Sequence, residues 1–342
     1  MAKKQDDAAY RKLKRDLAAG TPEHLYVFYG EERYLLEYYL GVLRTLLLAP
    51  GMEAFNHKRF DGRSLDLQEL ADALDALPVF AEHTLIEVSD FDLFSAEEDV
   101  RTRLLALFSD LPDYVTLVWI YDALEFKAGK RSKLNDALKA ALTLVEFPKQ
   151  EQSDLQNWII RRFGALGKQI DRPTAEYFSF LTGGLMTAMV PEIEKTAAFC
   201  ETDLITREAI DAVVTPVLEA SVYRMTDALL TRRFNAAAGI LADLLARREV
   251  PHRILYAVSQ EMRRLLAAKV CQESGGGLSQ LMELCGIRYE SQGRSLLATA
   301  RRRDMDRCRT SVRLCADAAL RLNQTTDGEA LLTQLLVELA AV

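Results

Sequence analysis

The sequence has few of the residues that form disulfide frameworks and metal centres. Its 342 residues include five cysteines and four histidines, and no two cysteines stand in a CxxC pair. This pattern predicts reduced thiols and no zinc site. No apolar run reaches the roughly eighteen residues of a membrane span, and the first residues, MAKKQDDAAYRKLKRDL, lack the apolar stretch of a secretory signal. We therefore expect a cytoplasmic protein with no membrane partner.

Catalytic motifs are also missing. The four histidines have no neighbouring serine or cysteine in a recognisable nucleophile motif, although residues distant in the sequence can meet in a fold; they are His24, His57, His83 and His252. The sequence thus predicts no catalytic residue, no metal and no cofactor of its own.

Negative charge is concentrated in the first part of the chain. The formal net charge is −7, and counting Asp, Glu, Lys and Arg gives −8 for residues 1–148, −3 for residues 149–212 and +4 for residues 213–342. An acidic surface repels nucleic-acid phosphates, so the first part is not expected to grip DNA by itself.

β-type and helical patterns alternate over the first 148 residues. Apolar runs rich in β-formers occupy residues 25–28, 55–60, 84–88, 114–121 and 142–147, with helix-type spacing between them. This alternation predicts an α/β domain whose parallel sheet is covered on both faces. After Phe147 only helical patterns follow. We expect three domains: an α/β domain at residues 1–148, a small helical domain at 149–215 and a larger helical domain at 216–342.

The turn after the first β-type run lies where many proteins bind a nucleotide phosphate. A working phosphate loop needs several glycines, a lysine, and a serine or threonine for Mg²⁺. This turn has a single glycine, Gly30, followed by Glu31 and Glu32. We expect both glutamates in the first turn of the next helix, where they complement the helix dipole and would repel a triphosphate. The turn is therefore interpreted as a degenerate phosphate-loop position that does not hydrolyse ATP.

A second nucleotide-like feature is the apolar run at residues 85–88, which leads to Asp90 and Asp92. In an ATPase an acid at such a strand end holds the metal. Without a lysine loop there is no phosphate for a metal to serve. An acidic strand end that faces solvent is the favoured interpretation.

The segment Leu77-Pro78-Val79-Phe80 places bulky apolar residues in a connection. Leu67, Leu70, Leu74 and Leu77 have the spacing of one helix face, and Pro78 should end that helix. Val79 and Phe80 then precede the next strand. Two interpretations stay open on local grounds: both side chains pack into the core, or they protrude as a hydrophobic contact for a partner's pocket.

The segment RRRDMDRCRTSVR, from Arg301 to Arg313, holds six arginines and two aspartates. Its first residues, Arg301, Arg302 and Arg303, could contact DNA phosphates or a neighbouring subunit. On a helix these charges would surround the outside, some paired at i, i+3 or i, i+4. A solvated or subunit-facing helix is the favoured interpretation, with DNA contact as the alternative.

Five segments taken in order resemble one protein family. They read VFYGEERYLLEYYL, FNHKRFDG, ALDALPVFAEHTLIEVSDF, VTLVWIYDALEFKAGKRSKLNDALKA and VEFPKQEQSDLQNWIIRRFGALGKQID. In order and spacing they are similar to the delta subunits of bacterial DNA polymerase III, over most of the chain and most strongly in the first 210 residues. The resemblance implies an α/β AAA+-like domain without a functional phosphate loop, a helical lid and a helical collar.

The resemblance also implies a function and partners. Delta subunits join gamma or tau and delta-prime in a five-membered clamp-loader ring, and they bind and open the sliding clamp, the beta subunit, for loading onto primed DNA during chromosomal replication. The clamp-binding residues carried over by alignment are Val79 and Phe80, with Leu77 and Pro78 beside them. The Ser-Arg-Cys motif of the hydrolysing and delta-prime subunits does not occur here, nor does their four-cysteine zinc module. The implied role is that of a subunit without catalysis of its own.

Two rival functions follow from the same residues. One is an active nucleotide hydrolase of this fold, which the turn at Gly30 disfavours. The other is a nucleic-acid-binding protein of AAA+ descent that uses Arg301–Arg313. ATP binding by the isolated chain would support the first rival, and steeply salt-dependent DNA binding by the third domain would support the second.

Overall fold

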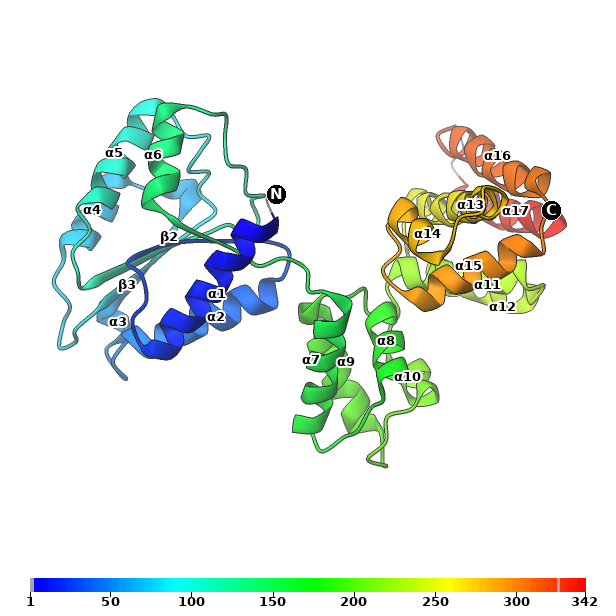
Figure 1. The fold of residues 1–342 in the computed structure, drawn as a ribbon, viewed down its shortest axis with the longest axis horizontal. Coiled ribbons are helices and arrows are strands. Elements are labelled where there is room, and N and C mark those ends of the chain that lie inside the picture. The colour runs from blue at the N-terminus through cyan, green and yellow to red at the C-terminus, as the bar shows by residue number, and fades with distance from the viewer. Residues whose placement is uncertain (1–2, 325–326) are drawn as a thin grey trace. The chain divides into compact units, whose positions relative to one another are not determined.

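The computed structural model describes residues 3–324 and 327–342 and divides the chain into two compact units, residues 1–149 and 150–342. Each unit is described by itself (Figure 1). The first unit contains α1 (Lys3–Ala19), β1 (Leu25–Tyr29), α2 (Arg33–Leu47), α3 (Glu53–Asn56), β2 (His57–Asp61), a 3-10 turn (Gly62–Ser64), α4 (Leu67–Asp75), β3 (Thr84–Ser89), α5 (Glu98–Ser109), β4 (Val115–Ile120), α6 (Lys133–Ala141) and β5 (Thr143–Glu146).

The strands of the first unit form one parallel sheet in the order β2-β3-β4-β1-β5. β1 lies in the interior, and its Val27 pairs with Trp119 of β4 on one side and Leu144 of β5 on the other. Continuous apolar runs such as those of β1 and β4 suit strands that are buried on both faces. The predicted parallel sheet is confirmed. The strand predicted at residues 55–60 begins later than expected, because residues 55 and 56 belong to the short helix α3 and β2 begins at His57.

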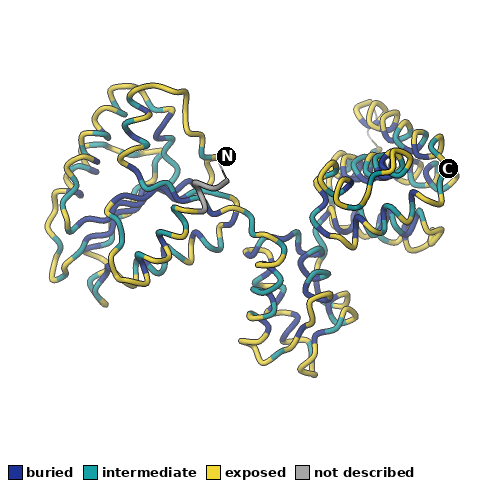
Figure 2. The backbone as a smooth tube through the Cα atoms, viewed as in Figure 1, coloured by how far each residue is buried: buried dark blue, intermediate teal, exposed yellow. Residues whose placement is uncertain are grey.

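Alternate side chains of each strand pack against different helices. One face joins Leu25 and Val27 of β1 to apolar residues of α4, α5 and α6. The other face joins Tyr26 and Phe28 of the same strand to residues of α1 and α2. Figure 2 shows the strands as a buried layer between these two helical layers. Because helices cover both faces of the sheet, the loops at the two ends of its strands are the parts that a partner or ligand can reach.

The second unit is built from helices. They are α7 (Gln152–Ala165), α8 (Arg172–Leu181), α9 (Met186–Phe199), α10 (Arg207–Val213), α11 (Leu218–Leu230), α12 (Phe234–Ala246), α13 (Pro251–Glu273), α14 (Leu278–Cys285), α15 (Glu290–Arg301), α16 (Met305–Leu322) and α17 (Gly328–Ala341). The predicted fold class, an α/β domain followed by all-α regions, is confirmed. The finer division of this unit at residue 215 stays a prediction. Among the described residues, no helix combines the length and apolarity that crossing a bilayer requires.

Candidate functional site

The turn after β1 is shaped by backbone packing. Gly30 has a φ of 131°, and a Cβ placed on it would lie 2.4 Å from the carbonyl oxygen of Phe147, just beyond β5. The backbone N–H of Glu32 donates to that same carbonyl oxygen at 2.9 Å. The glycine is thus required because two chain segments meet here, and one N–H that a phosphate loop would offer is already bonded.

The structure corrects the prediction that Glu31 and Glu32 lie in the first helical turn. α2 begins at Arg33, and Glu32 is its N-cap residue. The Glu32 side chain is fully buried, whereas Glu31 is exposed. Because the helix N-terminus is where a bound phosphate would lie, a buried carboxylate at this position opposes the binding of a second anion.

Asp90 serves the backbone of a neighbouring loop. It follows β3 with a φ of 57°, and its Oδ1 accepts the N–H groups of Asp122, Ala123 and Leu124 at 2.8–3.0 Å. Burial acts to raise the pKa of Asp90, but these three hydrogen bonds outweigh it and lower the pKa from its ordinary value. The prediction of an acid that simply faces solvent missed this role. Within the described ranges, no group of three or more His, Cys, Asp or Glu is placed to hold a metal ion.

The apolar segment at residues 77–80 protrudes from the first unit. α4 ends at Asp75, two residues before the spacing predicted, and the Tyr114 hydroxyl donates to the Asp75 carbonyl oxygen at 3.1 Å. Beyond that end, Leu77 is 75% exposed, Val79 38% and Phe80 90%, and Pro78 is half-buried. The core-packing interpretation is therefore wrong for Phe80. An exposed phenylalanine beside exposed aliphatic residues is the kind of surface that binds a partner's pocket.

Asn56, which the sequence analysis did not identify, anchors this segment. It ends α3, its exposure is 1%, and its side-chain amide makes two hydrogen bonds to the backbone of Val79. Phe55, the residue before it, is 55% exposed and adds a second aromatic ring beside the anchor. In the sequence, Asn56 appeared only as a polar residue within the predicted strand at residues 55–60, and nothing there indicated its bond to Val79.

The apolar segment and the turn at Gly30 lie at opposite edges of the sheet. All strands are parallel, so loops that follow strands meet at the carboxyl edge and loops that precede strands meet at the amino edge. The turn at Gly30 follows β1, whereas residues 76–83 precede β3. A partner bound to Phe80 would therefore approach the edge opposite the turn at Gly30.

The arginine-rich segment is interrupted by a turn. α15 ends at Arg301, and Asp304 caps α16, so the segment from Arg301 to Arg313 spans the end of one helix, a turn and the start of the next. Arg301 and Arg302 are exposed, and the described part of the chain gives neither side chain an ion-pair partner. Arg303 is half-buried, and burial together with nearby positive charge lowers its pKa. The next arginine, Arg307, pairs with Asp304 at 3.3 Å. Arg301 and Arg302 therefore place exposed positive charge at this turn, and Arg313 of α16 is exposed as well.

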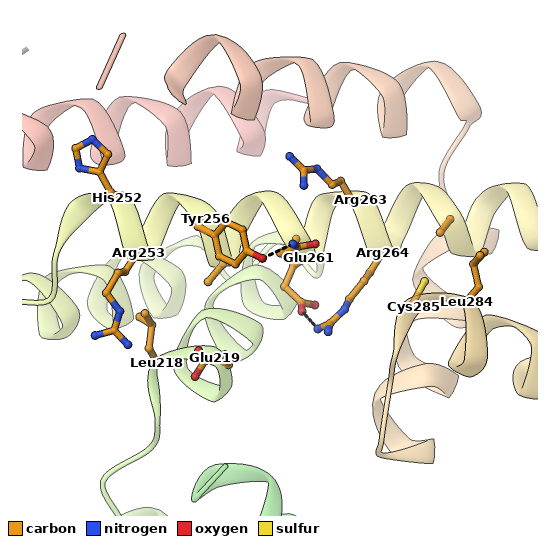
Figure 3. A pocket seen from close by; sticks show the side chains of 13 residues that line it. Leu218, Glu219, His252, Arg253, Tyr256, Glu261, Arg263, Arg264, Leu284 and Cys285 are labelled. Carbon is orange, nitrogen blue, oxygen red and sulfur yellow. Dashed lines mark hydrogen bonds and ion pairs between the residues drawn. The ribbon is translucent and has the colours of Figure 1, made fainter. Parts of the chain in front are cut away.

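A hollow of about 910 Å³ lies along α13 (Figure 3). Inside it, Glu261 is buried and accepts a hydrogen bond from Arg264 at 2.6 Å, and Gln260 donates to the Tyr256 hydroxyl at 2.8 Å. Burial raises the pKa of Cys285 at one end, which keeps its thiol protonated and makes it a poor nucleophile.

Two family descriptions match this chain. "DNA polymerase III, delta subunit" matches residues 26–148, and "DNA polymerase III delta subunit, C-terminal domain" matches residues 219–339, so that together they span more than half of the sequence. The chain belongs to the DNA polymerase III delta subunit family. It is accordingly a clamp-loader subunit, part of a DNA polymerase complex, and the resemblance seen in the sequence is confirmed.

Relatives of the delta family show how far this chain has diverged. It is 25% identical over 274 residues to the DNA polymerase III subunit delta of Bacillus subtilis strain 168, covering 78% of each protein. It is 23% identical over 278 residues to a probable DNA polymerase III subunit delta of Aquifex aeolicus strain VF5, covering 78% of this chain and 76% of the relative. The solved Bacillus subtilis DNA clamp loader delta protein has a similar fold, with a TM-score of 0.56 at 21% identity, over 97% of this chain and all of that one.

Proposed function

We propose that this delta-family chain binds a sliding clamp through Leu77, Pro78, Val79 and Phe80 and opens it for loading onto primed DNA. The observation that carries the proposal is Phe80, which is 90% exposed at the amino edge of a well-packed α/β unit. A phenylalanine fully buried in a partner's pocket contributes about 1.5–3 kcal/mol of transfer free energy. Such a side chain is the type of residue that dominates an interface.

Opening requires more than binding. A subunit shifts the clamp toward an open state only by the difference between its affinities for the open and closed forms. Phe80 and Val79 would supply the affinity, and the rigid unit behind them would favour the open form. ATP held by neighbouring subunits would decide when this surface is presented.

The proposed assembly is the five-membered clamp-loader ring of the cytoplasm, with gamma or tau and delta-prime as neighbours and the beta clamp as target. In this arrangement the chain itself does not hydrolyse ATP. The buried Glu32 carboxylate and the Phe147 carbonyl bonded to its N–H support that assignment.

The test is clamp affinity in the absence of the other subunits. We expect Phe80→Ala to weaken binding of the purified beta clamp by roughly 2–4 kcal/mol, about thirtyfold to nearly a thousandfold. Val79→Ala should cost less, because its side chain is smaller and only 38% exposed. Binding can be followed by fluorescence anisotropy of a labelled clamp.

Phe199→Ala is the matched control, since Phe199 is 57% exposed but belongs to the second unit. Its clamp affinity should equal that of the unmodified chain. Unchanged affinity in the Val79→Ala/Phe80→Ala double variant would remove this surface from the proposed mechanism.

A second candidate contact is DNA at the turn between α15 and α16. The exposure of Arg301 and Arg302 without ion-pair partners in the described residues favours it. Arg303 is half-buried beside them. In this proposal the arginines bind phosphates of primed DNA within the assembled complex, and the contact carries no sequence specificity.

A further inference from the structure

The Asn56 side chain holds Val79 by both of its backbone polar groups. Its amide Nδ2 donates to the Val79 carbonyl oxygen at 2.8 Å, and its Oδ1 accepts the Val79 N–H at 2.7 Å. The two residues are 23 positions apart in the sequence. The amide thus bonds both the N–H and the carbonyl group of one residue, as a paired β-strand does, and so restrains the backbone of Val79.

The residue after Val79 has an unusual backbone conformation. Phe80 has a φ of 50°, in the left-handed region that a bulky side chain seldom adopts. Such a conformation persists only where surrounding contacts hold it. Because the Phe80 side chain is 90% exposed, it has little packing of its own to hold the backbone. The Phe80 backbone must therefore be restrained through its neighbours. Asn56 bonds both the N–H and the carbonyl oxygen of Val79, the residue directly before it.

Asn56 is itself firmly placed. Its side chain is almost completely buried at 1% exposure, and it is the last residue of α3, directly before the first residue of β2. β2 is paired with β3 from His57 and Leu85 onward. The loop that carries Phe80 leads directly into β3 at Thr84. The Asn56 amide therefore ties the exposed loop to the start of β2, which follows Asn56, and that loop leads into β3, the strand paired with β2.

We propose that Asn56 is a positioning residue for clamp binding: it holds Val79 so that Phe80 is presented in its binding conformation before the clamp arrives. This inference rests on the proposed function of Phe80. A preordered loop binds more tightly because less conformational freedom is lost on association. Without the amide, the Val79 backbone groups would bond to water and Phe80 would leave the left-handed region.

The first measurement compares clamp affinity and loop order in the full chain. We expect Asn56→Ala to weaken binding of the purified beta clamp about tenfold, with the melting temperature of the first unit nearly unchanged. Hydrogen exchange over residues 76–83 should accelerate at least about tenfold, while strand amides stay protected. Asn56→Ser, whose short hydroxyl cannot make both bonds, should have a clamp affinity between those of Asn56→Ala and the unmodified chain. Asn235→Ala, at an exposed asparagine of the second unit, is the control and should leave clamp affinity and loop exchange unchanged.

A double-mutant cycle with Phe80→Ala separates positioning from general stability. If Asn56 acts through Phe80, Asn56→Ala will cause no further loss of clamp affinity in a Phe80→Ala background. Equal losses in both backgrounds, or full affinity in folded Asn56→Ala and Asn56→Ser, would overturn the inference while leaving Phe80 as the contact. If Phe80→Ala alone has no effect, the proposed function fails first.

Discussion

Glu87 is a carboxylate held inside the first unit by two basic side chains. It lies in β3 with an exposure of 3%, Arg44 bonds both of its oxygens at 2.8 Å, and the His57 Nε2 lies 3.0 Å from its Oε1. Burial alone would raise the pKa of Glu87, but hydrogen bonds from His57 and Arg44 together with the Arg44 charge lower it to about 2. The ion pair joins α2 to the β2–β3 half of the sheet, next to Asn56.

The depressed pKa predicts acid sensitivity of the first unit. A carboxyl group whose pKa falls on folding contributes stability above its unfolded pKa of about 4.5, and that stability is lost as pH falls toward the folded value of about 2. The contribution at neutral pH is roughly 3 kcal/mol. Glu87→Gln should therefore lower the free energy of unfolding at pH 7 and flatten its fall between pH 5 and pH 2.

The chain offers a convenient reporter for this experiment. Of its two tryptophans, Trp119 lies buried in β4 and Trp158 lies in the second unit. In a Trp158→Phe background, fluorescence during urea unfolding follows the first unit alone. Glu125→Gln, at a side chain that is 80% exposed, is the control and should keep the parent pH profile. An equally steep profile in Glu87→Gln would contradict the assigned role.

At the scale of elements, the turn between β1 and α2 is fixed by contact with the end of β5. Gly30→Ala would place a Cβ against the Phe147 backbone in a strained φ, so we expect a loss of at least about 2 kcal/mol in unfolding free energy. Gly41→Ala, within α2 and facing open space, should instead gain about 0.5–1 kcal/mol. Both can be measured with the Trp119 reporter.

The same measurement tests the hydrolase alternative. A site that bound ATP would raise the stability of the parent chain when Mg-ATP is added in excess of its dissociation constant. We expect no rise at millimolar Mg-ATP, and Gly30→Ala to be destabilised equally with and without the nucleotide. ATP-dependent stabilisation of the parent chain would restore the hydrolase reading of this turn.

Local patterns predicted the elements well and their tertiary roles poorly. Runs of β-formers located the sheet because parallel strands are buried on both faces and need continuous apolar sequence. The spacing that placed Leu77 on a helix failed because α4 already ends at Asp75, three residues before Pro78, where the Tyr114 hydroxyl bonds the Asp75 carbonyl oxygen. Asn56 was missed and Asp90 was misjudged because their partners are 23 and more than 30 residues away. Such partners become visible only once the sheet order is known.

At the scale of the whole molecule, charge is distributed in keeping with a division of tasks. Residues 1–148 carry a net charge of −8 and residues 213–342 carry +4. The first region holds the exposed apolar residues proposed to meet a protein, and the second holds the arginine turn proposed to meet DNA. The net negative charge of the region that contains Phe80 also disfavours DNA as its partner.

The arginine turn makes a prediction for the assembled clamp loader. Arg301→Ala/Arg302→Ala should weaken binding to primed DNA irrespective of sequence, and should reduce the slope of log affinity against log salt by about 1–2. The measurement is a salt titration of DNA binding by the reconstituted complex. Arg131→Ala, at a 94% exposed side chain of the first unit, is the control. An unchanged slope in the double variant would assign the turn to subunit contact or solvent.

The parallel order of the sheet has a consequence for how such a chain can evolve. Residues after β1 and residues before β3 belong to opposite edges of the sheet. Substitutions in the turn at Gly30 can therefore change one edge without touching the apolar segment at the other edge. The sheet between them, buried on both faces, is the part that is not free to change.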